Sequence, residues 1–236
     1  MSDDAAIRLG LIRGFELFAR DQRVRLPMST QRVVAFLALQ DRPVLRLYVA
    51  GTLWLDSTEA RANACLRTAL WRLRARDCPI VDATATHLAL ACGVEVDVRE
   101  ARVAAEQAIG HEILLGDPAT AGLYHAGELL PDWYDDWVLI EREHFRQLRL
   151  HALEALCRDL AAAGRFAEAA RAGLAAIKDE PLRESAHRAL ISTYLAEGNP
   201  SEALRHFTLF KKLLHDQLGL SPSELMDDLM GAVLNQ

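Results

Sequence analysis

The chain has 236 residues, of which 51% are hydrophobic, so it can bury a core and is not a disordered tail. The formal net charge of −6, taken over the whole chain, argues against a nucleic-acid partner. No signal-peptide segment opens the sequence, and no run of 18 apolar residues occurs. These absences predict a cytoplasmic protein without a membrane partner.

The charge is unevenly distributed along the chain. Residues 1–96 hold 13 Arg and no Lys against 10 Asp and Glu, a net charge of +3. Residues 97–236 hold 14 basic and 23 acidic residues, a net charge of −9. We therefore predict two domains, 1–96 and 97–236, whose surfaces suit different partners. The four cysteines lack the C-x-x-C spacing of zinc or redox sites, and the expected intracellular location predicts reduced thiols.

Residues 7–54 predict a small sheet followed by two helices. Residues 7–18 hold two apolar runs that Arg13-Gly14 separates, and Val24–Leu26 forms a third run, a pattern typical of an antiparallel sheet. Ser29 or Thr30 can cap a helix that reaches about Gln40. A second helix is predicted from about Leu45 to Trp54.

A third helix, Thr58–Arg76, carries five arginines and one glutamate, and Asp56 or Ser57 can cap its start. Its period places Ala62, Leu66, Ala69, Leu70 and Leu73 on one apolar face. The rest of its surface carries Arg61, Ala64, Arg67, Thr68, Trp71, Arg72 and Arg74. The arginine side chain is well shaped to bind phosphates and the edge of guanine in the major groove, so this face can be interpreted as a DNA-binding surface. A solvated amphipathic helix is the alternative interpretation.

Two short apolar runs, Ile80-Val81 and His87–Ala91, then predict a hairpin. The order of sheet, three helices and hairpin resembles the OmpR-type winged-helix DNA-binding domain, whose third helix ends in R-L-R, here Arg72-Leu73-Arg74. The resemblance implies that the third helix enters the major groove and the hairpin contacts the DNA backbone. Where that family often carries Gly-Tyr, this hairpin has Thr86-His87, and no Arg or Lys occurs from 77 to 98. The DNA-binding residues that we predict are Arg61, Arg67, Thr68, Trp71, Arg72, Arg74, Thr86 and His87.

Residues 97–236 are almost wholly helical in pattern. Trp133, Tyr134 and Trp137 are interpreted as anchors that pack a loop onto the next helix, with an exposed aromatic–acidic site as the alternative. Gly164 and Gly198 are 34 residues apart, as are Ala169 and Ala203, which is the tetratricopeptide period. The predicted fold is mostly α, with an N-terminal winged helix-turn-helix followed by an all-α tetratricopeptide-like domain.

The segments LLPDWYDDWV, EPLRESAHRALISTYLAEGNPSEAL and LLHDQLGLSPSEL resemble the bacterial transcriptional activator domain of SARP- and AfsR-type regulators. With the winged helix, the resemblance spans residues 6–234 in the family's order. It implies a DNA-binding transcriptional activator, nucleoid-associated when bound, with double-stranded promoter DNA and RNA polymerase holoenzyme as partners and a homodimer at least on DNA. In OmpR-like proteins the loop between helices two and three contacts polymerase, which here means Leu55, Asp56, Ser57 and Thr58.

Other functions have less support in the sequence. The pairs Glu141-x-x-His144 and Glu184-x-x-His187 have the spacing of di-iron bundles, but chance explains short pairs. No P-loop, dinucleotide-binding, zinc-protease or serine-hydrolase motif occurs, so we predict no enzyme, no cofactor and no metal site. The rival hypothesis is a repeat scaffold for protein partners whose winged helix no longer reads DNA.

Overall fold

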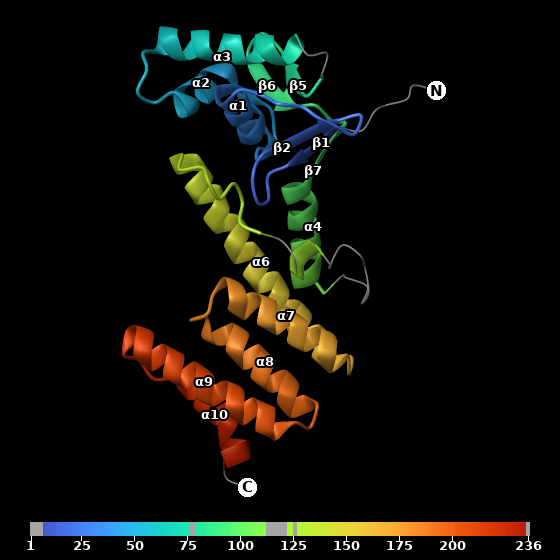
Figure 1. Cartoon of the computed structure of the whole chain (residues 1–236), viewed down its shortest axis with the longest axis vertical. Coiled ribbons are helices and arrows are strands. Elements are labelled where there is room, and N and C mark those ends of the chain that lie inside the picture. Colours follow the sequence, from blue (N-terminus) through green and yellow to red (C-terminus); the bar gives the residue numbers. More distant parts are fainter. Residues whose placement is uncertain (1–6, 76–78, 112–121, 125–126, 235–236) are drawn as a thin grey trace. The chain divides into compact units, whose positions relative to one another are not determined.

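A computed structural model describes residues 7–75, 79–111, 122–124 and 127–234, and it divides the chain into two compact units (Figure 1). Unit 1 comprises residues 1–100 and 127–144, and unit 2 comprises residues 101–126 and 145–236. Helices α4 (Asp97–Ile109) and α6 (Asp136–Ala162) contribute residues to both units. Unit 1 therefore takes in residues 127–144, which lie beyond the predicted boundary at residue 96.

A four-stranded sheet of order β3-β2-β1-β7 opens unit 1. Strands β1 (Ile7–Gly10), β2 (Glu16–Ala19) and β3 (Gln22–Arg23) are antiparallel neighbours, as predicted, whereas β7 (Val94–Val96) pairs with β1 in parallel and was not predicted. The third strand is Gln22–Arg23, so the prediction of Val24–Leu26 was wrong. Arg20 and Asp21 both adopt positive φ, which makes a two-residue hairpin turn and pairs Gln22 with Ala19.

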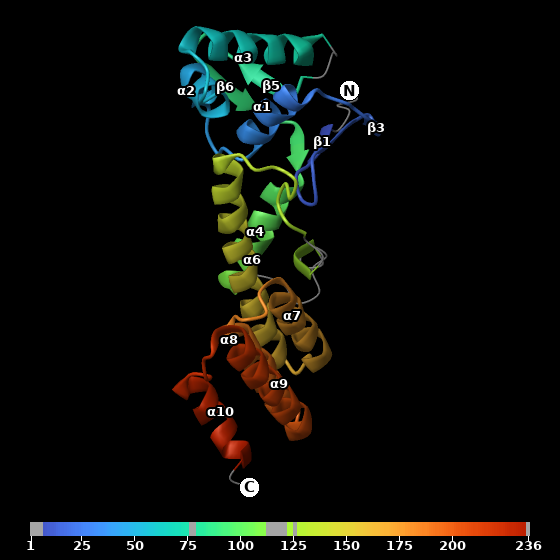
Figure 2. The same ribbon diagram turned by 60° about the vertical axis from the view of Figure 1, so that its left-hand side comes forward.

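The winged helix-turn-helix follows the first strands of this sheet. It consists of α1 (Met28–Ala38), α2 (Arg46–Leu53), α3 (Glu59–Arg74) and the sheet β4-β6-β5, made of β4 (Val44–Leu45), β6 (His87–Leu90) and β5 (Val81–Ala83). Figures 1 and 2 show α3 lying across α1 and α2, with the β5–β6 hairpin beside its C-terminal half. The predicted helix caps were wrong, because α1 begins after Pro27 and α3 after Thr58, neither with a side-chain cap. Arg76 and Cys78 lie outside the described residues.

Helix α1 forms the centre of unit 1, since every residue from Val33 to Leu39 is buried. The guanidinium of Arg99 on α4 donates to the carbonyl oxygens of Ala38 and Gln40 at 2.8 Å, which satisfies the end of α1. The carboxylate of Asp97 accepts hydrogen bonds from the backbone N–H groups of Leu11 and Ile12. The start of α4 is therefore fastened both to α1 and to the β1–β2 loop.

Residues 127–137 pack on the same core through two indole rings. The ring of Trp133 stacks on Phe15 at 6.1 Å between centroids, and the ring of Trp137 meets Phe36 of α1 edge-on at 5.3 Å. Arg142 donates to the carbonyl oxygens of Leu129 and Trp133 and so fixes the segment to α6. The predicted packing of a loop onto the next helix is confirmed for Trp133, which contacts Trp137 of α6. It is wrong for Trp137, which belongs to α6 and packs on α1, and for Tyr134, which is 80% exposed.

Unit 2 is a stack of helical hairpins formed by α6, α7 (Phe166–Asp179), α8 (Glu184–Ala196), α9 (Pro200–Leu218) and α10 (Glu224–Leu234). Two turns 34 residues apart have the same geometry. Gly164 and Gly198 both adopt positive φ, of 74° and 80°. The hydrogen bond from the Arg165 N–H to the Leu160 carbonyl, 2.9 Å, recurs as Asn199 to Tyr194 at 2.9 Å. The predicted repeat register is thereby confirmed.

Ala169 and Ala203 are fully buried in the two copies of the repeat. We expect Ala169→Leu or Ala203→Leu to overpack the helix crossing and to lower the free energy of unfolding by about 1–3 kcal/mol. Thermal or urea unfolding measures this loss. Ala167→Leu on the exposed face of α7 is the control, and equal stability of all three variants would contradict the packing assignment.

A stacked histidine pair lies between α8 and α9. His187 Nε2 donates to the Pro181 carbonyl oxygen at 2.8 Å, so its Nδ1 accepts from His206 Nε2 at 3.0 Å. Burial lowers the pKa of both rings, and the neighbouring His187 and Arg205 help to lower the pKa of His206 to about 4.

Because these folded-state pKa values lie below the unfolded value of 6.5, the unfolded chain binds protons first as the pH falls. The stability that the pair contributes is present above about pH 6.5 and is lost as the pH falls toward 4. We expect His206→Gln to show a flatter decline of unfolding free energy between about pH 7 and 5 than the parent chain. If the unfolding free energies of parent and variant fall in parallel over this pH range, the histidine pair is not the cause of the decline.

Candidate nucleic-acid interface

Helix α3 has a buried face and an exposed face that follow the helical period. The buried side chains are those predicted, namely Ala62, Leu66, Ala69, Leu70 and Leu73. They pack toward α1 and α2, which fixes the direction in which the remaining side chains point. The 16 residues of α3 include no Gly or Pro, the two residues that most often interrupt a helix. The exposed face is therefore carried by one uninterrupted helix.

The exposed face carries the predicted DNA-binding residues of α3. Arg61, Arg67, Thr68, Trp71 and Arg74 are exposed, whereas Arg72 is half-buried and its Nη1 lies 3.5 Å from Ser29 Oγ. At roughly 100° per residue, Thr68 and Trp71 lie in the middle of this face, with arginines on both flanks. Trp71 is 67% exposed, which is unusual for so large an apolar side chain.

Three arginines on this face have no anionic partner in the part of the chain that the structure describes. Arg61, Arg67 and Arg74 form no ion pair with any described residue, in contrast to Arg8, Arg23 and Arg32 elsewhere in unit 1. Unpaired guanidinium groups beside one another repel, and an anionic partner removes that cost. The face therefore suits a polyanion.

In the hairpin that follows α3, the predicted wing residues bond mainly to one another. Thr86 Oγ1 lies 2.9 Å from His87 Nδ1, and Thr84 Oγ1 accepts the backbone N–H of His87 at 2.9 Å. Arg46, which no sequence pattern assigned to the wing, donates from Nη1 to the Thr84 carbonyl oxygen at 3.0 Å. Pairing of β4 with β6 brings this arginine to the wing, which has no basic residue of its own among those described.

Three residues of the predicted polymerase loop Leu55–Thr58, namely Leu55, Asp56 and Ser57, line a groove of about 390 Å³ within unit 1. Its opposite side is formed by Tyr134, Asp135 and Asp136. Leu55 is 73% exposed, and Asp135 forms an ion pair with Arg32 that holds this side against α1. The sequence could not reveal the second side, because nearly 80 residues separate it from the loop.

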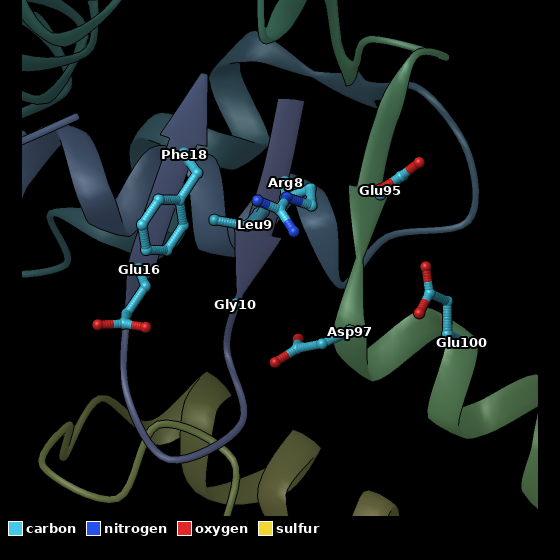
Figure 3. A pocket seen from close by; sticks show the side chains of 8 residues that line it. All are labelled: Arg8, Leu9, Gly10, Glu16, Phe18, Glu95, Asp97 and Glu100. Atoms are coloured by element: carbon cyan, nitrogen blue, oxygen red, sulfur yellow. The ribbon is translucent and has the colours of Figure 1, made fainter. Parts of the chain in front are cut away.

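A second pocket of unit 1, about 350 Å³, lies on the N-terminal sheet and is lined by Arg8, Leu9, Gly10, Glu16, Phe18, Glu95, Asp97 and Glu100 (Figure 3). The guanidinium of Arg8 lies 5.9 Å from the ring centre of Phe18 and bonds Asp21 at 2.5 Å. Burial raises the pKa of Asp97, while hydrogen bonds from the Leu11 and Ile12 N–H groups oppose that rise. This pocket is mainly acidic and does not suit a nucleic acid.

Metal and membrane sites find no support in the described part of the chain. No group of three or more His, Cys, Asp or Glu residues there has the arrangement to hold a metal ion. His187 of the second E-x-x-H pair is buried and bonded to a carbonyl oxygen and to His206. None of the helices described is both long enough and apolar enough to cross a bilayer.

The sequence and the fold of this chain are similar to those of known proteins. The family described as bacterial transcriptional activator domain matches residues 95–234. A solved structure of Mycobacterium tuberculosis EmbR in complex with a low affinity phosphopeptide has the same fold, with a TM-score of 0.74 and 21% identity. The match covers 98% of this chain and 66% of that one. No curated protein matches the sequence.

Proposed function

The chain belongs to the bacterial transcriptional activator domain family, and from this premise we propose that it is a sequence-specific activator that binds double-stranded DNA. In this proposal α3 enters the major groove of promoter DNA. The observation that carries it is the exposed face of α3, where arginines flank Thr68 and Trp71. Of these, Arg61, Arg67 and Arg74 form no ion pair with any described residue. The family is one of transcriptional regulators, which are normally not enzymes.

Phosphate contacts supply most of the affinity in this proposal. Arg61 and Arg67 reach phosphates, whereas Arg72 and Arg74 reach base edges near the C-terminal end of α3. Arg46 adds a positive charge beside the wing, so that Thr86 and His87 contact the backbone next to it. A homodimer places two α3 helices on two half-sites, which multiplies the affinity of one module.

The groove beside Leu55 is the proposed contact for RNA polymerase holoenzyme. It combines an exposed leucine, an exposed tyrosine and the carboxylates of Asp56 and Asp136. Large aromatic and aliphatic side chains at the rim of a groove are typical of protein interfaces. In this proposal the protein acts in the cytoplasm, where bacterial promoters and RNA polymerase are found.

A protein-binding scaffold is the second candidate function. The observation that favours it is the wing, whose polar groups are largely occupied by one another. Selection of duplexes from a random library by the full chain separates the two candidates. Enrichment of one motif supports the activator, whereas a library that stays random after several rounds supports the scaffold.

Arg67→Ala tests the phosphate role of α3. We expect this variant to weaken binding to all DNA sequences by a similar factor, because a phosphate contact carries no base information. The slope of log affinity against log salt should become about 0.9 units less steep. An unchanged slope, or a loss confined to one DNA sequence, would contradict the phosphate assignment.

A further inference from the structure

The middle of the exposed face of α3 is apolar. It is formed by the side chains of Ala64, Thr68 and Trp71, one helical turn apart along the axis. The hydroxyl of Thr68 donates its hydrogen to the Ala64 carbonyl oxygen at 3.0 Å, so the methyl group and the ring of Trp71 dominate what this ridge presents. The indole adds a single N–H donor at one edge.

The major groove of DNA offers one apolar group to such a ridge. This is the 5-methyl group of thymine, since the other base edges present hydrogen-bond donors and acceptors. Arg61 and Arg67 lie on opposite sides of the ridge and match the two phosphate backbones that border the groove, which favours DNA over an apolar protein partner for this face.

We propose that the Ala64–Thr68–Trp71 ridge reads thymine methyl groups at the centre of each half-site. This inference rests on the proposed function, and it adds the chemical identity of the bases that α3 selects. Arginines then read guanine or phosphates on either side of a short thymine-containing step. The same ridge would accept 5-methylcytosine, which presents the same methyl group at the same place.

The test compares duplexes that differ by single methyl groups. In a duplex that the full chain binds selectively, each thymine of the half-site is replaced in turn by uracil, which keeps its base pairing and its O4 acceptor. We expect one or two positions at which affinity falls roughly fourfold, the factor that corresponds to about 0.8 kcal/mol for one methyl-sized group. Replacing a cytosine by 5-methylcytosine beside those positions should strengthen binding.

Protein variants assign the methyl effect to the ridge. Trp71→Ala should bind the thymine and uracil duplexes equally, whereas Trp71→Phe should keep most of the preference. Arg67→Ala should bind both duplexes more weakly and keep their ratio. Melting temperatures of all variants confirm that they are folded.

Three results would overturn the inference. Equal binding of thymine and uracil duplexes by the parent chain would show that the methyl group is not recognised, and it would not contradict DNA binding. An unchanged preference in Trp71→Ala would mean that residues other than the ridge read the methyl group. Absence of any selective duplex would sink the proposed function itself, so the two failures are distinguishable.

Discussion

Trp133→Ala is expected to lower the free energy of unfolding of unit 1 by about 3–5 kcal/mol. The indole is 7% exposed, stacks on Phe15 and meets Trp137 edge-on at 6.3 Å between ring centres. Its removal is expected to leave a cavity beside the rings of Phe15 and Trp137. Because Trp137 in turn contacts Phe36 of α1, the loss should also loosen the helix against which α3 packs.

Urea unfolding followed by far-ultraviolet circular dichroism measures the effect. Tyr134→Ala is the matched control, since the adjacent side chain is 80% exposed and its removal should change stability by less than about 0.5 kcal/mol. Equal stability of the two variants would mean that residues 127–144 do not support the core of unit 1.

The same contacts bear on the isolated N-terminal fragment. The predicted first domain, residues 1–96, ends before several of these contacts. Such a fragment lacks Trp133, Trp137, the Arg32–Asp135 ion pair and the Arg99 hydrogen bonds to the end of α1. We propose that residues 97–100 and 127–144 complete the DNA-binding module.

Arg72→Ala and Arg74→Ala are each expected to weaken specific DNA binding by about 1–3 kcal/mol, roughly 5- to 150-fold. In this assignment the guanidinium donates two charge-assisted hydrogen bonds to guanine, and in the alanine variant water replaces them with weaker ones. The fold should be unaffected, because Arg74 is exposed and the half-buried Arg72 has one long side-chain hydrogen bond among the described residues, to the Ser29 hydroxyl at 3.5 Å.

Fluorescence anisotropy with a selected duplex measures these losses. The control is Arg205→Ala on α9, whose side chain is 80% exposed and pairs with Glu202. All three variants should melt at the temperature of the parent chain. If both α3 variants bind as tightly as the control, the groove assignment of α3 is wrong.

Local patterns predicted much of this fold. The buried face of α3 follows from the helical period, and the repeat register follows from Gly164 and Gly198, where the chain must adopt positive φ to turn. Both signals are periodic patterns of residue type along the chain, so neither needs knowledge of the tertiary fold.

Long-range contacts account for what the sequence did not reveal. The Asp97 carboxylate accepts a hydrogen bond from the Leu11 N–H, 86 residues away in the sequence. The parallel pairing of β7 with β1 likewise joins segments that are far apart in the sequence. Arg46 belongs to the wing only because β4 pairs with β6. The helix caps failed for a local reason, since Pro27 and the extended Thr58 begin their helices without a bonded side chain.

Sequence-selective DNA binding is the central claim, and one titration tests it most directly. The full chain is titrated with its selected duplex and with a scrambled duplex of equal length, at about 50 mM and 200 mM salt. We predict at least about a thousandfold preference for the selected duplex, with both affinities falling as salt rises. Equal affinity for the two duplexes, or no binding even at the lower salt, would contradict it.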